Sequence, residues 1–302
     1  MRIWLGDVQV GDDCPSYFVA ECGQNHNGDL NIALAMVRAA HAAGASAVKF
    51  QMRTPELAIP EDQQGVMRDT PWGRLTYLDY RRKLELSEAA YEWIDRECQR
   101  LGITWFASSW DLPSLDFLLH FAPPAIKIPS ACLTNHLLLA RAAASGYPVI
   151  LSTGMSTAEE IDRAVDVVLD HEKAALVLMH CKSTYPAKPK ILNLRAIRTL
   201  MGKYGDEAVI GYSGHEVGLW TTLDARVLGA MVLERHFTLD RSMWGTDQSA
   251  SIEPGGVRKL VQQLRRFEEA EGDGQLGVDP SELETLRKLR RITTSGHDNR
   301  PL

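Results

Sequence analysis

Residues 145–161, SGYPVILSTGMSTAEEI, contain the pattern of one complete strand-to-helix unit. Gly146 is typical of a helix end, and the apolar run Val149–Ser152 after it predicts a short buried strand. A polar turn follows, and Thr157 with Glu160 three residues later is the capping-box pattern that begins a helix. The stretch therefore predicts a helix end, a buried strand, a polar turn and a new helix, in that order.

The same order recurs along the chain. Eight strands are predicted, at Tyr17–Glu21, Ala47–Gln51, Thr104–Ser108, Ala125–Ile128, Val149–Ser152, Leu176–His180, Val209–Tyr212 and Val232–Phe237. They are continuous apolar runs, as expected for strands that are covered on both faces. Eight successive units of this kind favour an α/β fold closed into a (β/α)8 TIM barrel, with a doubly wound sheet as the alternative.

Three segments lie outside this repeat. The first fifteen residues predict a short N-terminal hairpin that closes one end of the barrel. Residues 52–86 form a long insertion after the second strand, and a long loop in a compact domain is usually functional. Residues 280–291 have the pattern of one more helix. We predict a single barrel domain over residues 1–291 and a flexible tail over residues 292–302.

Composition narrows the class of protein. The 302 residues are 45% hydrophobic and 24% charged, with a net charge of -6, which is typical of a globular domain and argues against a nucleic-acid or anionic-membrane partner. Five widely spaced cysteines without a CxxC pair favour free thiols in a reducing cytoplasm. We see no signal peptide, and no apolar stretch approaches the roughly 20 residues of a membrane helix.

Polar residues collect at or just after the carboxyl ends of the predicted strands, which is where a parallel barrel holds its active site. An apolar strand that ends in a charged group needs a partner for that group. Several strand ends with this property together indicate a site. The candidates are Glu21, Lys49, Gln51, Ser108, Lys127, Ser130, Ser152, Ser183, Tyr185, Ser213, His215, His236 and Asp247.

Two kinds of chemistry are indicated. Lys49 and Lys127 among several serines favour a phosphate cradle, although each lysine could instead pair with a buried carboxylate such as Glu21. His215 and His236 end neighbouring strands, about 5 Å apart, so both imidazoles can reach one divalent cation. The alternative for each histidine is a hydrogen-bonded residue of the core.

The sequence resembles the sialic acid synthase (N-acetylneuraminate synthase) family over about residues 17–270. The matching stretches are AECGQNHNGD, AGASAVKFQ, PAIKIPSACLTN, PVILSTGMSTAEEI, LMHCKSTYPAK, NLRAI, GYSGHEVG and LERHFTLDRSMWGTDQSASIEP. The resemblance implies a TIM barrel that condenses phosphoenolpyruvate with an aldose. The product is a sialic-acid-like 2-keto-3-deoxy sugar acid, and the aldose is N-acetylmannosamine-like, with or without a phosphate.

The resemblance also implies roles for the candidates. His215 and His236 match metal ligands, and the metal is a divalent cation, manganese or magnesium. Glu21 and Asp247 match acidic residues near the reacting carbons, and Gln51 and Tyr185 match positions that face the sugar. The positions that match the phosphoenolpyruvate site are Lys49, Ser108, Lys127, Ser130, Ser152, Ser183 and Ser213. A cytoplasmic homodimer is expected.

The chain departs from the family pattern in three places. Gln248 stands where relatives usually have a histidine after the aspartate, and Cys132 stands where they are often acidic or polar. We expect a short form without the C-terminal antifreeze-like domain, which in relatives lends an arginine to the partner's sugar pocket. The 52–86 insertion, with Arg74 and Arg81, is the candidate for a lid that holds the sugar instead.

Two other function classes stay open. One is a different metal-dependent barrel enzyme, such as an aldolase that acts on a 2-keto acid or a hydrolase. The other is a sugar-binding protein without catalytic activity, which predicts losses among the charged residues. Phosphate release from phosphoenolpyruvate separates the first class from a synthase.

Overall fold

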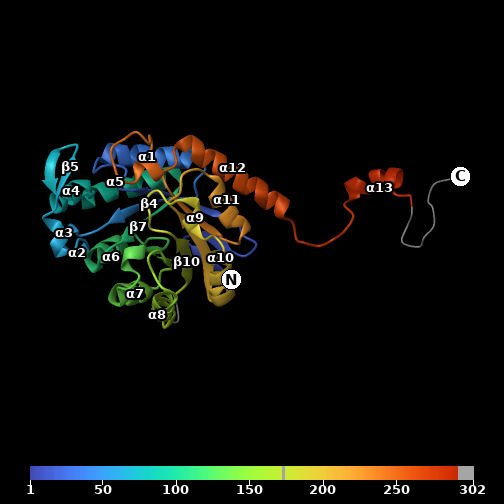
Figure 1. The fold of residues 1–302 in the computed structure, drawn as a ribbon, viewed down its shortest axis with the longest axis horizontal. Coiled ribbons are helices and arrows are strands. Elements are labelled where there is room, and N and C mark those ends of the chain that lie inside the picture. Colours follow the sequence, from blue (N-terminus) through green and yellow to red (C-terminus); the bar gives the residue numbers. More distant parts are fainter. Residues whose placement is uncertain (172–173, 292–302) are drawn as a thin grey trace. The chain divides into compact units, whose positions relative to one another are not determined.

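The computed structural model describes residues 1–171 and 174–291, and within them eight parallel strands form a closed barrel (Figure 1). The strands are β3 (Tyr17–Gly23), β4 (Ala47–Met52), β7 (Thr104–Ser109), β8 (Ile126–Ile128), β9 (Val149–Ser152), β10 (Leu176–Cys181), β11 (Ala208–Gly214) and β12 (Val232–His236). They pair in chain order, and β12 pairs with β3 to close the ring. The predicted TIM barrel is therefore confirmed, and the doubly wound alternative is excluded.

Helices follow the strands and cover the outside of the barrel. They are α1 (Leu30–Ala42), α5 (Glu88–Leu101), α6 (Leu112–Leu119), α7 (His136–Ala143), α8 (Ala158–Leu169), α10 (Ala196–Tyr204), α11 (Trp220–Val227) and α12 (Pro254–Glu271). The capping box predicted at Thr157 and Glu160 is present at the start of α8. Two residues thus satisfy two backbone N–H groups that the helix leaves free at its start.

The core has two parts. One lies between the strands and the surrounding helices, and the other fills the barrel interior. The N-terminal hairpin, β1 (Arg2–Leu5) with β2 (Val8–Gly11), adds Ile3, Leu5 and Val10 to the interior cluster. These side chains cluster with the first residues of several barrel strands, so the hairpin closes the amino-terminal end as predicted. The opposite end, where the strands finish, holds the polar residues.

The insertion after β4 has secondary structure of its own. It contains α2 (Pro55–Ala58), α3 (Glu61–Gln64), the antiparallel pair β5 (Met67–Thr70) and β6 (Gly73–Thr76), and α4 (Tyr77–Leu84). Helix α4 contacts the other four elements, so the insertion is one packed unit and not an open loop.

Three shorter elements lie in loops at the carboxyl ends of strands, namely η1 (Ser130–Cys132), α9 (Pro189–Leu192) and η2 (Gln248–Ala250). Further on, η3 (Pro280–Glu282) and α13 (Leu283–Leu289) occupy the helix predicted for residues 280–291. The chain divides into two compact units, Met1–Arg265 and Arg266–Leu302. The single domain over residues 1–291 stays a prediction, and the tail 292–302 lies outside the described residues. None of the described helices is long and apolar enough to cross a membrane.

Candidate active site

A cavity of about 220 Å³ opens at the carboxyl ends of the barrel strands. Of the residues predicted from the sequence, it is lined by Glu21, Lys49, Gln51, Ser108, Lys127, Ser130, Ser152, Ser183, Tyr185, Ser213, His215 and His236. Asp247 does not line it, although one carboxylate oxygen, Oδ2, lies 4.0 Å from Nδ1 of His236. A larger cavity of about 410 Å³ lies around β7, α5 and α6, and none of the predicted site residues lines it. The chemistry therefore belongs to the smaller cavity.

Two lysines and two glutamates alternate across the floor of this cavity. Lys49 forms an ion pair with Glu21, and its Nζ lies 3.7 Å from Oε1 of Glu234. Lys127 pairs with Glu234 from the other side, at 3.2 Å. All four side chains are buried, which is possible because each charge has an opposite charge beside it. The alternative interpretation of the lysines, pairing with buried carboxylates, is thus confirmed.

Serine hydroxyls complete this floor. Lys49 donates to Ser108 Oγ at 2.9 Å, and Lys127 donates to Ser152 Oγ at 2.7 Å. Ser213 donates to Oε1 of Glu234 at 3.1 Å. The ammonium groups and hydroxyls that could bind a phosphate therefore face one cavity, although the lysines also have carboxylate partners.

The two glutamates have opposite proton affinities. Burial raises the pKa of Glu21, and the nearby Lys49 only partly opposes this effect. Burial also acts on Glu234, but the attraction of Lys127 and Lys49 is larger and lowers its pKa. Two carboxylates whose environments separate their pKa values are typical of sites that transfer protons. Glu234 remains ionised, and Glu21 is the carboxylate more able to exchange a proton.

The two histidines come from the ends of β11 and β12, and their ring centroids lie 5.3 Å apart. His215 Nδ1 lies 2.7 Å from the carbonyl oxygen of Lys182, which fixes its ring. His236 Nδ1 is buried and has no hydrogen-bond partner among the described residues. Burial lowers the pKa of His236, so its imidazole is neutral. A neutral, buried nitrogen without a hydrogen bond is the form that binds a metal ion.

The protein offers few further ligands for a metal there. The described part of the chain contains no group of three or more His, Cys, Asp or Glu side chains arranged to hold a metal ion. The two imidazoles would therefore leave other coordination positions open, as a catalytic metal site requires. The ring of Tyr185, about half exposed, lies 4.1 Å from that of His215 at the cavity mouth.

Gln51 links the cavity to the insertion. Its Nε2 donates to Glu21 Oε1 at 2.8 Å, and its Oε1 accepts from the guanidinium of Arg53. Arg53 in turn pairs with Glu85 at 3.0 Å, and its guanidinium lies over the ring of Trp110, 4.1 Å from the centroid. The residue predicted to face a sugar is thus also a partner of a predicted catalytic carboxylate.

Sequence reasoning missed Glu234, which contacts both lysines. The signal was present, because Glu234 is a charged residue inside the otherwise apolar strand Val232–Phe237, as Lys49 and Lys127 are in theirs. Arg53 and Trp110 were also missed. They lie one or two residues beyond strand ends, where the sequence pattern does not separate site residues from ordinary loop residues.

Comparisons with known proteins show the family to which the chain belongs. The NeuB family model matches residues 36–276. The N-acetylneuraminate-9-phosphate synthase of Homo sapiens is 36% identical, over 93% of this chain and 78% of its own length. The N,N'-diacetyllegionaminic acid synthase of Legionella pneumophila is 34% identical, over 95% of this chain and 82% of its own. The solved structure of a sialic acid synthetase from Leptospira borgpetersenii superposes with a TM-score of 0.85 and 35% identity, covering 96% of this chain and 98% of that one.

A closed parallel barrel with lysines, acids and two histidines at its carboxyl-terminal mouth defines an enzyme. The chain belongs to the NeuB family. It is a phosphoenolpyruvate-dependent synthase that condenses this substrate with a sugar.

Proposed function

We propose that the enzyme condenses phosphoenolpyruvate with an N-acetylmannosamine-like aldose, with or without a phosphate. The products are a sialic-acid-like 2-keto-3-deoxy sugar acid and inorganic phosphate. One observation carries the proposal, namely that a single cavity holds the lysines and serines on its floor and the two histidines beside them. A phosphorylated enol and an aldehyde can thus be held in contact.

In this proposal Lys49 and Lys127 bind the anionic groups of phosphoenolpyruvate. The serines donate further hydrogen bonds, from Ser108, Ser130, Ser152, Ser183 and Ser213. A charge-assisted hydrogen bond contributes more to binding than a neutral one. The carboxylates of Glu21 and Glu234 hold both ammonium groups in place before the substrate arrives.

Synthases of this family are generally metal-dependent. His215 and His236 would hold a divalent metal, manganese or magnesium, because the buried Nδ1 of His236 has no hydrogen-bond partner among the described residues and its ring is neutral. When bound, such a metal acts as a Lewis acid that polarises an aldehyde oxygen.

The side chains around it orient the reactants and move protons. C3 of phosphoenolpyruvate forms the new bond to the aldehyde carbon, and water then adds at C2. Glu21 accepts the proton of that water, and the oxygen of the former aldehyde takes up one proton. The C–O bond to phosphate then breaks as the C2 hydroxyl loses its proton to the departing phosphate. Asp247, Gln51 and Tyr185 orient the sugar. The overall reaction consumes one phosphoenolpyruvate, one aldose and one water, and it yields one sugar acid and one phosphate.

The experiment combines the purified enzyme, phosphoenolpyruvate and a panel of aldoses with manganese or magnesium. We expect phosphate release only with a suitable aldose. The product should have the summed mass of phosphoenolpyruvate, aldose and one water, less one phosphoric acid. Phosphoenolpyruvate labelled with ¹⁸O at its bridging oxygen should deliver the label to the phosphate, because C–O cleavage is proposed. Chelation should abolish turnover, and added metal should restore it.

Pyruvate in place of phosphoenolpyruvate is the control for the aldolase alternative. Condensation of pyruvate with an aldose, without phosphate release from phosphoenolpyruvate, would contradict the proposed reaction. Full turnover in excess chelator by metal-free enzyme would contradict the metal. The cytoplasm as location and a homodimer as assembly stay predictions.

A further inference from the structure

The loop between β12 and α12 carries Asp247, and its two ends are joined. The backbone N–H of Ile252 donates to the carbonyl of His236 at 2.7 Å, and that of Thr238 donates to the carbonyl of Ile252 at 3.1 Å. Residues 238–252 therefore form a closed excursion that leaves the barrel at His236 and returns beside it. Asp247 lies within this excursion, so its position depends on what fills the loop.

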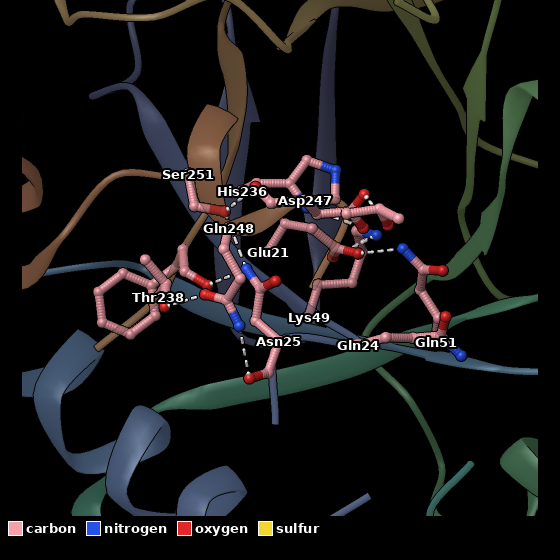
Figure 2. Close-up of polar contacts among 12 residues, drawn as sticks. Glu21, Gln24, Asn25, Lys49, Gln51, His236, Thr238, Asp247, Gln248 and Ser251 are labelled. Carbon is pink, nitrogen blue, oxygen red and sulfur yellow. Dashed lines mark hydrogen bonds and ion pairs between the residues drawn. The ribbon is translucent and has the colours of Figure 1, made fainter. Parts of the chain in front are cut away.

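The side chain of Gln248 fills this loop, and both polar atoms of its amide are hydrogen-bonded. The side chain is 1% exposed. Its Nε2 donates to the carbonyl of Asn25 at 3.1 Å, and its Oε1 accepts from the hydroxyl of Thr238 (Figure 2). The same Nε2 also donates to the carbonyl of Trp244 at 3.3 Å. A primary amide supplies two donors and an acceptor, which suits these three partners.

Asn25 and Ser251 hold the other side of the same loop. Asn25 Nδ2 donates to the carbonyl of Phe237 and to Ser251 Oγ, both at 2.8 Å. Ser251 Oγ in turn donates to the carbonyl of Asp247 at 2.7 Å. The chain of contacts thus runs from the turn after β3 to the backbone of Asp247 itself, through buried, uncharged groups (Figure 2).

The carboxylate of Asp247 has little other support. Its Oδ1 accepts a hydrogen bond from the adjacent Thr246 at 3.0 Å, and its Oδ2 lies 4.0 Å from His236 Nδ1. A contact with the neighbouring residue in the chain does not anchor it to the barrel. Its distance from His236 is therefore set by its backbone, which the network around Gln248 holds.

We propose that Gln248, together with Asn25 and Ser251, is a positioning network that places Asp247 against His236 for the condensation. The inference rests on the proposed function, since that assigns Asp247 its role at the sugar. Gln248 itself does not touch the reactants. It acts through Asp247, because a small displacement of a reacting group lowers the rate steeply.

A double-mutant cycle tests the proposal. Gln248→Met keeps the size of the side chain and removes its hydrogen bonds, so we expect kcat to fall by roughly 10- to 100-fold, with the KM for phosphoenolpyruvate changed less than about twofold. In an Asp247→Asn background the same change should cost less than about threefold, because residues that act as one unit are not additive. An equal penalty in both backgrounds would overturn the proposal, as would an unchanged kcat.

A second pair of variants tests the same network if Gln248→Met does not fold. Thr238→Val removes the hydroxyl that Gln248 accepts from, and Thr238→Ser retains it. We expect the valine variant to lose turnover in the same direction and the serine variant to retain it. Equal activity of the two would overturn the network, because size alone would then explain the position.

Hydrogen exchange separates this inference from the proposed function. Amides of residues 238–252 should exchange faster in Gln248→Met than in the wild type, whether or not any aldose is converted. Unchanged exchange would overturn the network. A wild-type enzyme that condenses no aldose would instead overturn the proposed function.

Discussion

Lys127 and Glu234 form an ion pair with both side chains buried. Such a pair is weak evidence for stability, because the cost of removing two charges from water often equals their attraction, and apolar replacements can be as stable. The pair also lines the cavity, where a substrate anion would reach the lysine. Binding of a substrate anion therefore explains the buried Lys127 better than a contribution to the stability of the fold.

Lys127→Met should weaken phosphoenolpyruvate binding by about 1.5–3 kcal/mol, roughly 10- to 100-fold, because one charge-assisted hydrogen bond is lost. The variant also leaves Glu234 with only Lys49, which destabilises the fold. The double variant Lys127→Met/Glu234→Gln removes the carboxylate that has lost its nearer lysine, and it serves as the control. Binding is measured by titration calorimetry and stability by urea unfolding.

The double variant should regain most of the stability and still bind weakly. Lys49→Met should show the same loss of affinity. If phosphoenolpyruvate affinity is unchanged in both lysine variants, the phosphate is held elsewhere.

The 52–86 insertion is fixed to the barrel mouth through its last helix and the residue after it. Gln24, after β3, donates to Glu85 Oε1 at 2.6 Å and accepts from the guanidinium of Arg81 on α4. Arg81 also donates to Tyr77, at 2.8 Å. Among the described residues, however, none from 53–86 lines the active-site cavity. The lid stays a prediction, and the insertion reaches the site through Arg53 and Gln51.

Arg81→Ala should raise the KM for the aldose severalfold and leave phosphoenolpyruvate affinity nearly unchanged, because the lost contacts lie on the Gln51 side of the cavity. Arg82→Ala is the matched control. The neighbouring Arg82 pairs with Glu56 and Asp79 at the surface, so its loss should change neither constant. Steady-state kinetics for both substrates, measured on both variants, test this prediction.

A more drastic version deletes residues 60–75, which contain α3, β5 and all of β6 but Thr76, and joins the ends with a short linker. The Arg81 and Glu85 contacts are retained. If kinetics for both substrates survive this deletion, the hairpin does not select the sugar and the barrel loops alone hold it.

The described segment after α12 buries almost none of its side chains. Residues 272–291 are exposed apart from the half-buried Leu286, whereas α12 buries Val257, Leu260 and Leu264. Buried apolar side chains contribute most of the stability of a domain. The described residues therefore place the stabilising contacts before Gly272.

Removing residues 272–302 should shift the midpoint of thermal unfolding by less than about 2 °C, because the described part of this segment, 272–291, is almost entirely exposed and exposed residues contribute little to stability. Removing residues 255–302 is the control, and it should prevent folding because the buried face of α12 is lost. Circular dichroism during heating measures both. A large drop for the shorter truncation would show that the segment after α12 packs on the barrel in solution.

The barrel was predictable from the sequence because parallel strands that are buried on both faces appear in it as short apolar runs. Val149–Ser152 has the predicted bounds. Five other strands extend one to three residues beyond their predicted bounds, and β8 and β12 are each one residue shorter than predicted. Charged residues at strand ends predicted the cavity for the same reason. Glu234 could have been found in this way and was not.

The network around Gln248 could not be predicted. Gln248 and Asn25 are 223 residues apart, and their contact depends on the closing pair β12–β3 and on the path of one loop. Asp247, outside the cavity lining, illustrates the same limit. Patterns along a chain record burial and period, but they do not record which loops meet in space.

The β12–β3 pairing also has a consequence for biosynthesis. Phe237 donates its backbone N–H to the carbonyl of Glu21 at 2.7 Å, so the first and last strands of the barrel meet at the proposed proton acceptor. A nascent chain emerging from the ribosome has its lysines early, but it cannot assemble the mouth until residue 237 has left the exit tunnel. Half-made copies thus carry Lys127 without its partner Glu234, and they depend on late closure of the ring to complete the site.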